Sequence, residues 1–212
     1  MEVKTITVGM NQTNCYVVFD RASGEASVID PGAEANVILN FLTSNALRVK
    51  NIFLTHGHFD HILAVQQVQE KTGGRVVIHE ADAECLKSSR QALYSSIMRE
   101  PFRVSKADIC LKGGEKTLVG TVEAEFLHTP GHTPGSMCIL MDNVLFTGDT
   151  LFEGDVGRTD LPGGDPYEMH YTLGKLYRLP YDYIVYPGHG AATTLGFERD
   201  NNASLRAAVG LK

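Results

Sequence analysis

The stretch Thr55-His56-Gly57-His58-Phe59-Asp60-His61 places three histidines and an aspartate within six residues. It lies between a short apolar run typical of a strand and an apolar pattern at helical spacing. Imidazole nitrogen combined with carboxylate oxygen suits zinc, iron or manganese. Alternation in an extended loop directs His56 and His58 the same way, whereas Asp60 and His61 turn toward a neighbouring site where the helix begins. One loop therefore starts two adjacent metal sites.

Three more residues of ligand type follow expected strands, and a glycine precedes each of them. They are His132 in Pro130-Gly131-His132-Thr133, Asp149 in Thr147-Gly148-Asp149-Thr150, and His189 in Pro187-Gly188-His189-Gly190. Glycine permits the tight turns that bring a ligand's backbone close to a crowded centre. A Gly-His pair alone marks only a turn, but with the first loop these residues make a seven-ligand set. The remaining histidines are interpreted as structural or exposed, with His128 a candidate hydrogen-bond partner of a ligand; they are His79, His128 and His170.

Strand-like and helix-like patterns alternate along the whole chain. Strands are expected over 1–7, 15–19, 26–30, 52–55, 76–78, 123–127, 137–141, 144–146 and 183–186. Helices are expected over 37–42, 62–68 (ending at Gly73-Gly74), 81–90, from Pro166 onward, and over 197–208, with 91–116 loop-like. Because no repeat or linker divides this mixture, we expect one α/β or α+β domain over 1–212.

Composition narrows the class of protein. The chain has 212 residues and a net charge of −6, so it lacks the basic excess of a nucleic-acid binder. No apolar run approaches the roughly 18 residues of a membrane span, and we expect no membrane partner. The four cysteines form no CxxC pair, and no secretory signal is evident at the N-terminus, which favours reduced thiols in the cytoplasm; they are Cys15, Cys85, Cys110 and Cys138.

The ligand set resembles that of the metallo-β-lactamase superfamily, whose signature is HxHxDH followed by distant His, Asp and His. The match runs from Asp30-Pro31-Gly32 to His189. The resemblance implies a four-layer αββα sandwich with two divalent metals at one edge of the facing sheets. Zinc is the expected metal, with iron or manganese as alternatives. The resemblance further implies that the first metal is held by His56, His58 and His132, the second by Asp60, His61 and His189, with Asp149 bridging them.

Within that superfamily the chain is similar to the short bacterial members of the hydroxyacylglutathione hydrolase (glyoxalase II) group. The similarity lies in Asn14-Cys15-Tyr16, Gly157-Arg158-Thr159-Asp160, Pro187-Gly188-His189-Gly190 and Thr194-Leu195-Gly196-Phe197-Glu198. We expect residues 1–212 to lack the added C-terminal domain through which full-length members contact glutathione. The β-lactamases of the superfamily usually carry arginine at the position of His61, which disfavours antibiotic hydrolysis.

The resemblance implies hydrolysis of a small-molecule thioester by a metal-bridging hydroxide, which Asp60 also orients. A thiolate is a good leaving group, so no strong general acid is needed. Arg158 and Asp160 are expected to form an ion pair that braces Asp149. The rival reading is a persulfide dioxygenase with one iron on His56, His132 and Asp149-type ligands. A lactonase or a non-catalytic metal-bound scaffold is the further alternative, and the thiol carrier and oligomeric state stay open.

Overall fold

Two six-stranded sheets face each other in the computed structural model, which describes residues 1–94 and 101–211. The first has the order β1-β2-β3-β4-β5-β6 and the second β14-β13-β10-β9-β8-β7. The first sheet comprises β1 (Glu2–Val8), β2 (Thr13–Phe19), β3 (Glu25–Ile29), β4 (Arg48–Phe53), β5 (Arg75–His79) and β6 (Ile109–Leu111). The second comprises β7 (Lys116–Val119), β8 (Val122–His128), β9 (Met137–Met141), β10 (Val144–Gly148), β13 (Ile184–Pro187) and β14 (Thr193–Thr194). A separate hairpin pairs β11 (Leu151–Phe152) with β12 (Asp155–Val156).

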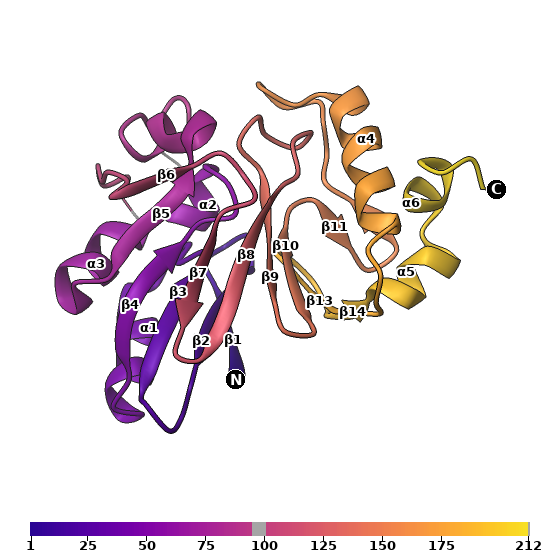
Figure 1. The fold of residues 1–212 in the computed structure, drawn as a ribbon. Helices are drawn as coiled ribbons and strands as arrows, with labels where there is room; N and C mark the ends of the chain where they lie inside the picture. The colour runs from indigo at the N-terminus through magenta and orange to yellow at the C-terminus, as the bar shows by residue number, and fades with distance from the viewer. Residues whose placement is uncertain (95–100, 212) are drawn as a thin grey trace.

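Helices cover the outer faces of both sheets (Figure 1). The first group comprises α1 (Ala35–Ser44), α2 (Phe59–Ile62), α3 (Val65–Thr72) and the 3-10 helix η1 (Glu80–Leu86). The second comprises α4 (Pro166–Tyr177), α5 (Leu195–Asn201) and α6 (Ala203–Ala207). Over the described ranges, no helix is long and apolar enough to span a membrane.

Strand β2 shows why the layers stack as they do. All seven of its residues are buried, because side chains alternate between two covered faces. Cys15, Val17 and Phe19 pack in the core shared with α1 and α3. Tyr16 and Val18 point into the core between the two sheets, together with residues of β8, β9 and β10. A third core lies between the second sheet and α4, which confirms the expected four-layer αββα sandwich.

Several stretches differ from the sequence-based expectation. The helix expected over 62–68 is divided between α2 and α3, and the short strands β11, β12 and β14 were not expected. The helix expected over 81–90 is a 3-10 helix that ends at Leu86. Beyond it, the backbone N–H of Gln91 donates to Ser88 Oγ in a turn. The loop expected over 91–116 contains the short strand β6 and the first residue of β7; its residues 95–100 lie outside the described ranges. The final helix is divided at Asn202, whose side chain caps α6.

The sheets bring the ligand-bearing segments to one edge. His56 follows β4, His132 follows β8, Asp149 follows β10 and His189 follows β13. Strands β8 and β10 each run antiparallel to β9, and β13 is parallel to β10. Their carboxyl ends therefore meet at the same edge of the second sheet, and β4 delivers its loop to that edge from the first sheet.

Candidate metal centre

Seven side chains from four loops converge in three overlapping clusters. His56, His58 and His132 form one cluster of metal-ligand type, and Asp60, His61 and His189 form another. Asp149 joins His56 and His61 in the third. Within each cluster the ligand atoms all lie within 4.8 Å of one another. All the residues that the sequence nominates as ligands are thus brought together.

Asp149 lies between the two histidine groups. Its Oδ2 atom is 3.5 Å from His132 Nε2 and 3.6 Å from His189 Nε2. Its Oδ1 atom is 3.4 Å from His61 Nε2. Gly188 has to be glycine here, because a Cβ atom at that position would lie 2.2 Å from Asp149 Oδ1. One carboxylate therefore faces ligands of both metal positions.

Hydrogen bonds outside the cluster orient three of the imidazole rings. His132 Nδ1 donates to the carbonyl oxygen of Arg158 at 2.8 Å, and His189 Nδ1 donates to that of Asn11 at 3.0 Å. His61 Nδ1 donates to Asp30 Oδ2 at 2.9 Å. Since each Nδ1 carries a proton, a neutral ring presents the lone pair of its Nε2 atom to the centre.

The cluster fits a divalent cation. His61 Nε2 and His189 Nε2 are 3.3 Å apart, close to the ~3.3 Å expected of two nitrogens on one tetrahedral zinc. Two neutral rings with protonated Nδ1 atoms would aim lone pairs at each other across that gap. Among the described residues, His56 Nε2 and Asp149 Oδ1 are buried without a hydrogen-bond partner. Such groups are costly unless a cation satisfies them.

The charges of the cluster also favour a cation. Burial, with help from neighbouring histidines, lowers the pKa of His56 well below its usual value and that of His58 to about 4. Burial opposes charge on Asp149, yet the surrounding histidines outweigh it and lower the pKa of this carboxyl. Burial likewise opposes charge on His61, but Asp149 and Asp30 raise its pKa well above the usual value. His56 and His58 thus face the ionised carboxylate of Asp149 as neutral imidazoles, the form that a metal requires, whereas His61 has to release its Nε2 proton when a metal binds.

Asp30 is a site residue that the sequence indicates only as the end of an expected strand and the start of the family match. Its carboxylate is buried and accepts hydrogen bonds from the backbone N–H of Thr55 at 2.7 Å, from Thr55 Oγ1 at 2.6 Å and from His61 Nδ1. Thr55 Oγ1 in turn lies 3.1 Å from His56 Nδ1. Asp30 thereby fixes the start of the ligand loop and the ring of His61.

The hairpin between β1 and β2 holds the His189 loop. Asn11 Nδ2 donates to Asp60 Oδ2 at 2.9 Å, so Asn11 contacts one ligand by its side chain and His189 by its carbonyl. Asn14 Nδ2 donates to the carbonyl oxygens of Pro187 at 3.1 Å and Gly190 at 2.9 Å. In the sequence, only the polar run at 11–14 pointed to a role for Asn11 and Asn14. It could not reveal their contacts, because the partners of Asn14 lie 173 and 176 positions away in the chain.

Two expected supporting contacts are made differently. Arg158 and Asp160 form an ion pair at 2.7 Å, but both side chains are mostly exposed, at 61% and 69%. Arg158 supports the centre through its carbonyl oxygen on His132, rather than through its side chain on Asp149. His128 Nε2 donates to the carbonyl oxygen of Pro134, so it supports the loop of His132 rather than a ligand side chain.

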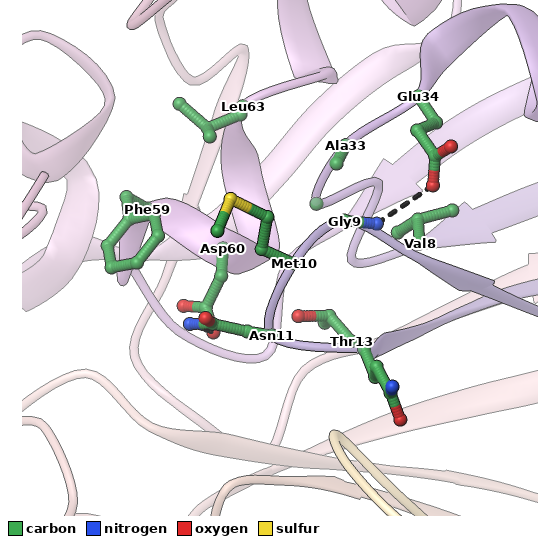
Figure 2. A pocket seen from close by; sticks show the side chains of 12 residues that line it. Val8, Gly9, Met10, Asn11, Thr13, Ala33, Glu34, Phe59, Asp60 and Leu63 are labelled. Carbon is green, nitrogen blue, oxygen red and sulfur yellow. Dashed lines mark hydrogen bonds between the residues drawn. The ribbon is translucent and has the colours of Figure 1, made fainter. Parts of the chain in front are cut away.

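A cavity of about 580 Å³ adjoins the centre. Asp60 belongs to both, and Figure 2 shows Asn11 beside it at one end of the cavity. Met10 lines the same space from the hairpin turn, Phe59 from α2 and Leu63 from the C-terminal end of that helix (Figure 2). A molecule bound there would place an apolar portion against these side chains and a reactive bond near Asp60.

Comparison with known proteins agrees with this geometry. The family model described as the metallo-beta-lactamase superfamily matches residues 8–189. A curated relative from Haemophilus influenzae, named hydroxyacylglutathione hydrolase GloC, is 33% identical over 98% of this chain and 99% of its own length.

Two solved structures have the same architecture. The BLEG-1 B3 metallo-beta-lactamase gives a TM-score of 0.89 at 36% identity, covering 96% of this chain and 99% of the other. The protein TTHA1623, solved in a di-iron-bound form, gives a TM-score of 0.81 at 34% identity, covering 94% and 98%.

Proposed function

The chain belongs to the metallo-β-lactamase superfamily of metal-dependent hydrolases, and we propose that it cleaves a small-molecule thioester. The single observation that carries the proposal is the complete pair of ligand clusters joined by Asp149. A persulfide dioxygenase retains the HxHxDH residues but binds one iron, so it would leave the cluster of Asp60, His61 and His189 without a metal, and the metal count separates the two activities. A non-catalytic scaffold has no use for either cluster.

The residues divide between holding metal and holding substrate. His56, His58 and His132 would hold one divalent metal and Asp60, His61 and His189 the other, with Asp149 between them. When bound, the two metals would supply a nucleophile from water near neutral pH and would polarise the scissile carbonyl. Zinc suits these donors, while the di-iron form of a relative makes iron the first alternative.

Asp60 has the second role in this proposal, the orientation of the attacking water. Its Oδ2 atom accepts a hydrogen bond from Asn11 Nδ2, which fixes the rotation of the carboxylate. Asp60 also lies where the cavity meets the cluster, so a substrate in the cavity presents its carbonyl beside it. A cysteine-type thiol has a solution pKa of about 8.5, so it departs as the thiolate without a general acid from the protein.

The cavity lining suggests which part of the substrate binds there. Met10, Phe59 and Leu63 offer apolar contact, which suits the carbon chain of an acyl group. Hydroxyacylglutathione is the first substrate to test, because the curated relative is named for it. The same acyl group on other thiol carriers comes next.

Metal analysis combined with a substrate panel tests the proposal. We expect two equivalents of metal per chain and hydrolysis of at least one thioester. Asp149→Asn and His132→Ala should lower the rate by at least about 100-fold, the scale of losing a group that stabilises developing charge. His170→Ala is the matched control, because His170 is an exposed histidine on α4.

The panel also decides among the rivals. A β-lactam belongs in it because a similar structure is a B3 metallo-beta-lactamase, and a lactone tests the remaining hydrolase. Oxygen uptake with glutathione persulfide, together with one iron per chain, would establish the dioxygenase instead and reject the thioesterase.

A further inference from the structure

Asp82 is a buried carboxylate that lies outside the ligand clusters. Only 2% of it is exposed. Its Oδ2 atom accepts hydrogen bonds from the backbone N–H of Gly57 at 2.9 Å and from Thr133 Oγ1 at 2.7 Å. Its Oδ1 atom accepts one from the backbone N–H of Gly135 at 2.8 Å. Three neutral donors thus converge on one ionisable side chain.

The partners of Asp82 belong to the two loops that carry the first cluster, which comprises His56, His58 and His132. Gly57 lies between His56 and His58, and Thr133 directly follows His132. These loops come from β4 in one sheet and β8 in the other. A shift of Asp82 would therefore move all three ligands of the first cluster relative to one another.

Both loops rest directly on η1, the element that bears Asp82. A Cβ atom at Gly57 would lie 2.5 Å from Cys85 Cβ, and one at Gly135 would lie 2.6 Å from Asp82 Cγ. Glycine at these positions lets the backbone come close enough to bond the carboxylate. The two loops are therefore closely packed against η1, with no room for a side chain at either glycine.

Two histidines secure η1 itself. His79 Nδ1 accepts a hydrogen bond from the backbone N–H of Ala81 at the start of η1. The ring of His79 stacks on that of His128, with centroids 4.1 Å apart and planes 12° apart. His128 in turn donates to the carbonyl oxygen of Pro134, so the stack ties η1 to the loop of His132 a second time.

We propose that Asp82 is the positioning residue of the first metal cluster: through Gly57, Thr133 and Gly135 it sets the spacing of His56, His58 and His132. The inference rests on the proposed function only in taking that cluster as a metal site. Asp82 touches neither metal nor substrate. It acts on the loops that present the ligands.

Asp82→Asn tests the proposal, because an amide of the same shape cannot accept from all three donors. Every protein in this test also carries His189→Ala, which disables the second cluster, and the chain with this substitution alone is the parent. Each protein is titrated with Co²⁺ or Zn²⁺ against a chelator. We expect about tenfold weaker metal binding at the first cluster, the lower end of the loss usual for supporting residues. The visible absorption bands of the bound Co²⁺ should shift as well.

Glu198→Gln is the matched control. Glu198 is likewise a buried carboxylate that accepts three hydrogen bonds, from Gly154, Thr193 and Asn202. We expect this variant to lose stability while its metal affinity and Co²⁺ spectrum stay at the values of the His189→Ala parent. Asp82→Asn with the same unchanged affinity and spectrum would show a purely structural role and overturn the proposal.

Thr133→Val carries the test if Asp82→Asn does not accumulate as folded protein. It removes one donor to Asp82, together with the bond between Thr133 Oγ1 and Ser136 Oγ, and it keeps the shape of the side chain. We expect at least about fivefold weaker binding at the first cluster, the effect of the lost hydrogen bond to Asp82. Unchanged binding in this variant would overturn the role of Asp82. If the parent itself bound no metal at the first cluster, the proposed function and this inference would both fail.

Discussion

Replacing Asp30 by asparagine should disable the second metal cluster through the protonation of His61. In the wild-type chain the Asp30 carboxylate accepts from Thr55 N, Thr55 Oγ1 and His61 Nδ1. The backbone of Asp30 has φ 49°, a left-handed conformation that asparagine tolerates. The substitution therefore changes the hydrogen bonding and leaves the turn intact.

The magnitude follows from the donors around the new amide. If the oxygen of this amide keeps the backbone N–H of Thr55, its NH₂ group faces His61 Nδ1. His61 then satisfies the amide by accepting on Nδ1, which moves its proton to Nε2, the atom 3.4 Å from Asp149 Oδ1. A lost hydrogen bond to a charged group is worth about 1.5–3 kcal/mol. Since about 1.4 kcal/mol is tenfold, the second metal should bind about 10- to 100-fold more weakly.

Chelator competition with metal analysis measures this effect. Asp30→Asn should retain about one metal per chain under conditions where the wild type retains two, and thioester hydrolysis should fall with the second metal. Asp108→Asn is the control, because Asp108 also accepts from a backbone N–H, that of Val76 at 2.8 Å. Two metals bound by Asp30→Asn with wild-type affinity would refute the argument that Asp30 sets the proton of His61.

Three further outcomes are expected. Chelation should lower the melting temperature by about 5–10 °C in differential scanning calorimetry. The reason is that free metal at 100 times its dissociation constant adds about 2.7 kcal/mol to the free energy of unfolding. An unchanged melting temperature would contradict a metal shared by both sheets. Asn11→Ala should lower kcat about fivefold through loss of the bond to Asp60, while the melting temperature of the metal-loaded chain changes by less than about 2 °C; equal rates would remove Asn11 from the site. At pH 8 an alkylating reagent should label Cys110 first, because it is exposed, whereas burial raises the pKa of Cys85 to about 12 and that of Cys138 to about 11; mass spectrometry after Cys110→Ser should then show little fast labelling.

The ligands were open to prediction from the sequence because they repeat chemical types at short, regular offsets after strand-like runs. The four-layer order was predictable only through the family resemblance, since apolar patterns show that β2 is buried but do not show on which partners. Short elements such as β6, with three residues, carry too little periodicity to be recognised. Asp30 and Asp82 were missed for another reason. A lone acidic residue in a sequence is typical of the surface. Asp30 and Asp82 accept hydrogen bonds from residues that are 25 to 53 positions away in the chain, and only the fold brings these partners together.

The positions of these two carboxylates indicate how the sandwich couples its sheets to its chemistry. Asp30 follows β3 and braces the ligand loop from within the first sheet, whereas Asp82 joins that loop to the His132 loop of the second sheet. Two further hydrogen bonds join the sheets near the metal centre. The backbone N–H of Met137 donates to the carbonyl oxygen of Thr55 at 2.8 Å, and Asn14 Nδ2 donates to the carbonyl oxygen of Pro187. These bonds need no metal, so the ligand loops are held near their positions before metal binds. Metal binding then has less ordering entropy to overcome, and a chelated chain should stay folded at about 25 °C while it melts earlier.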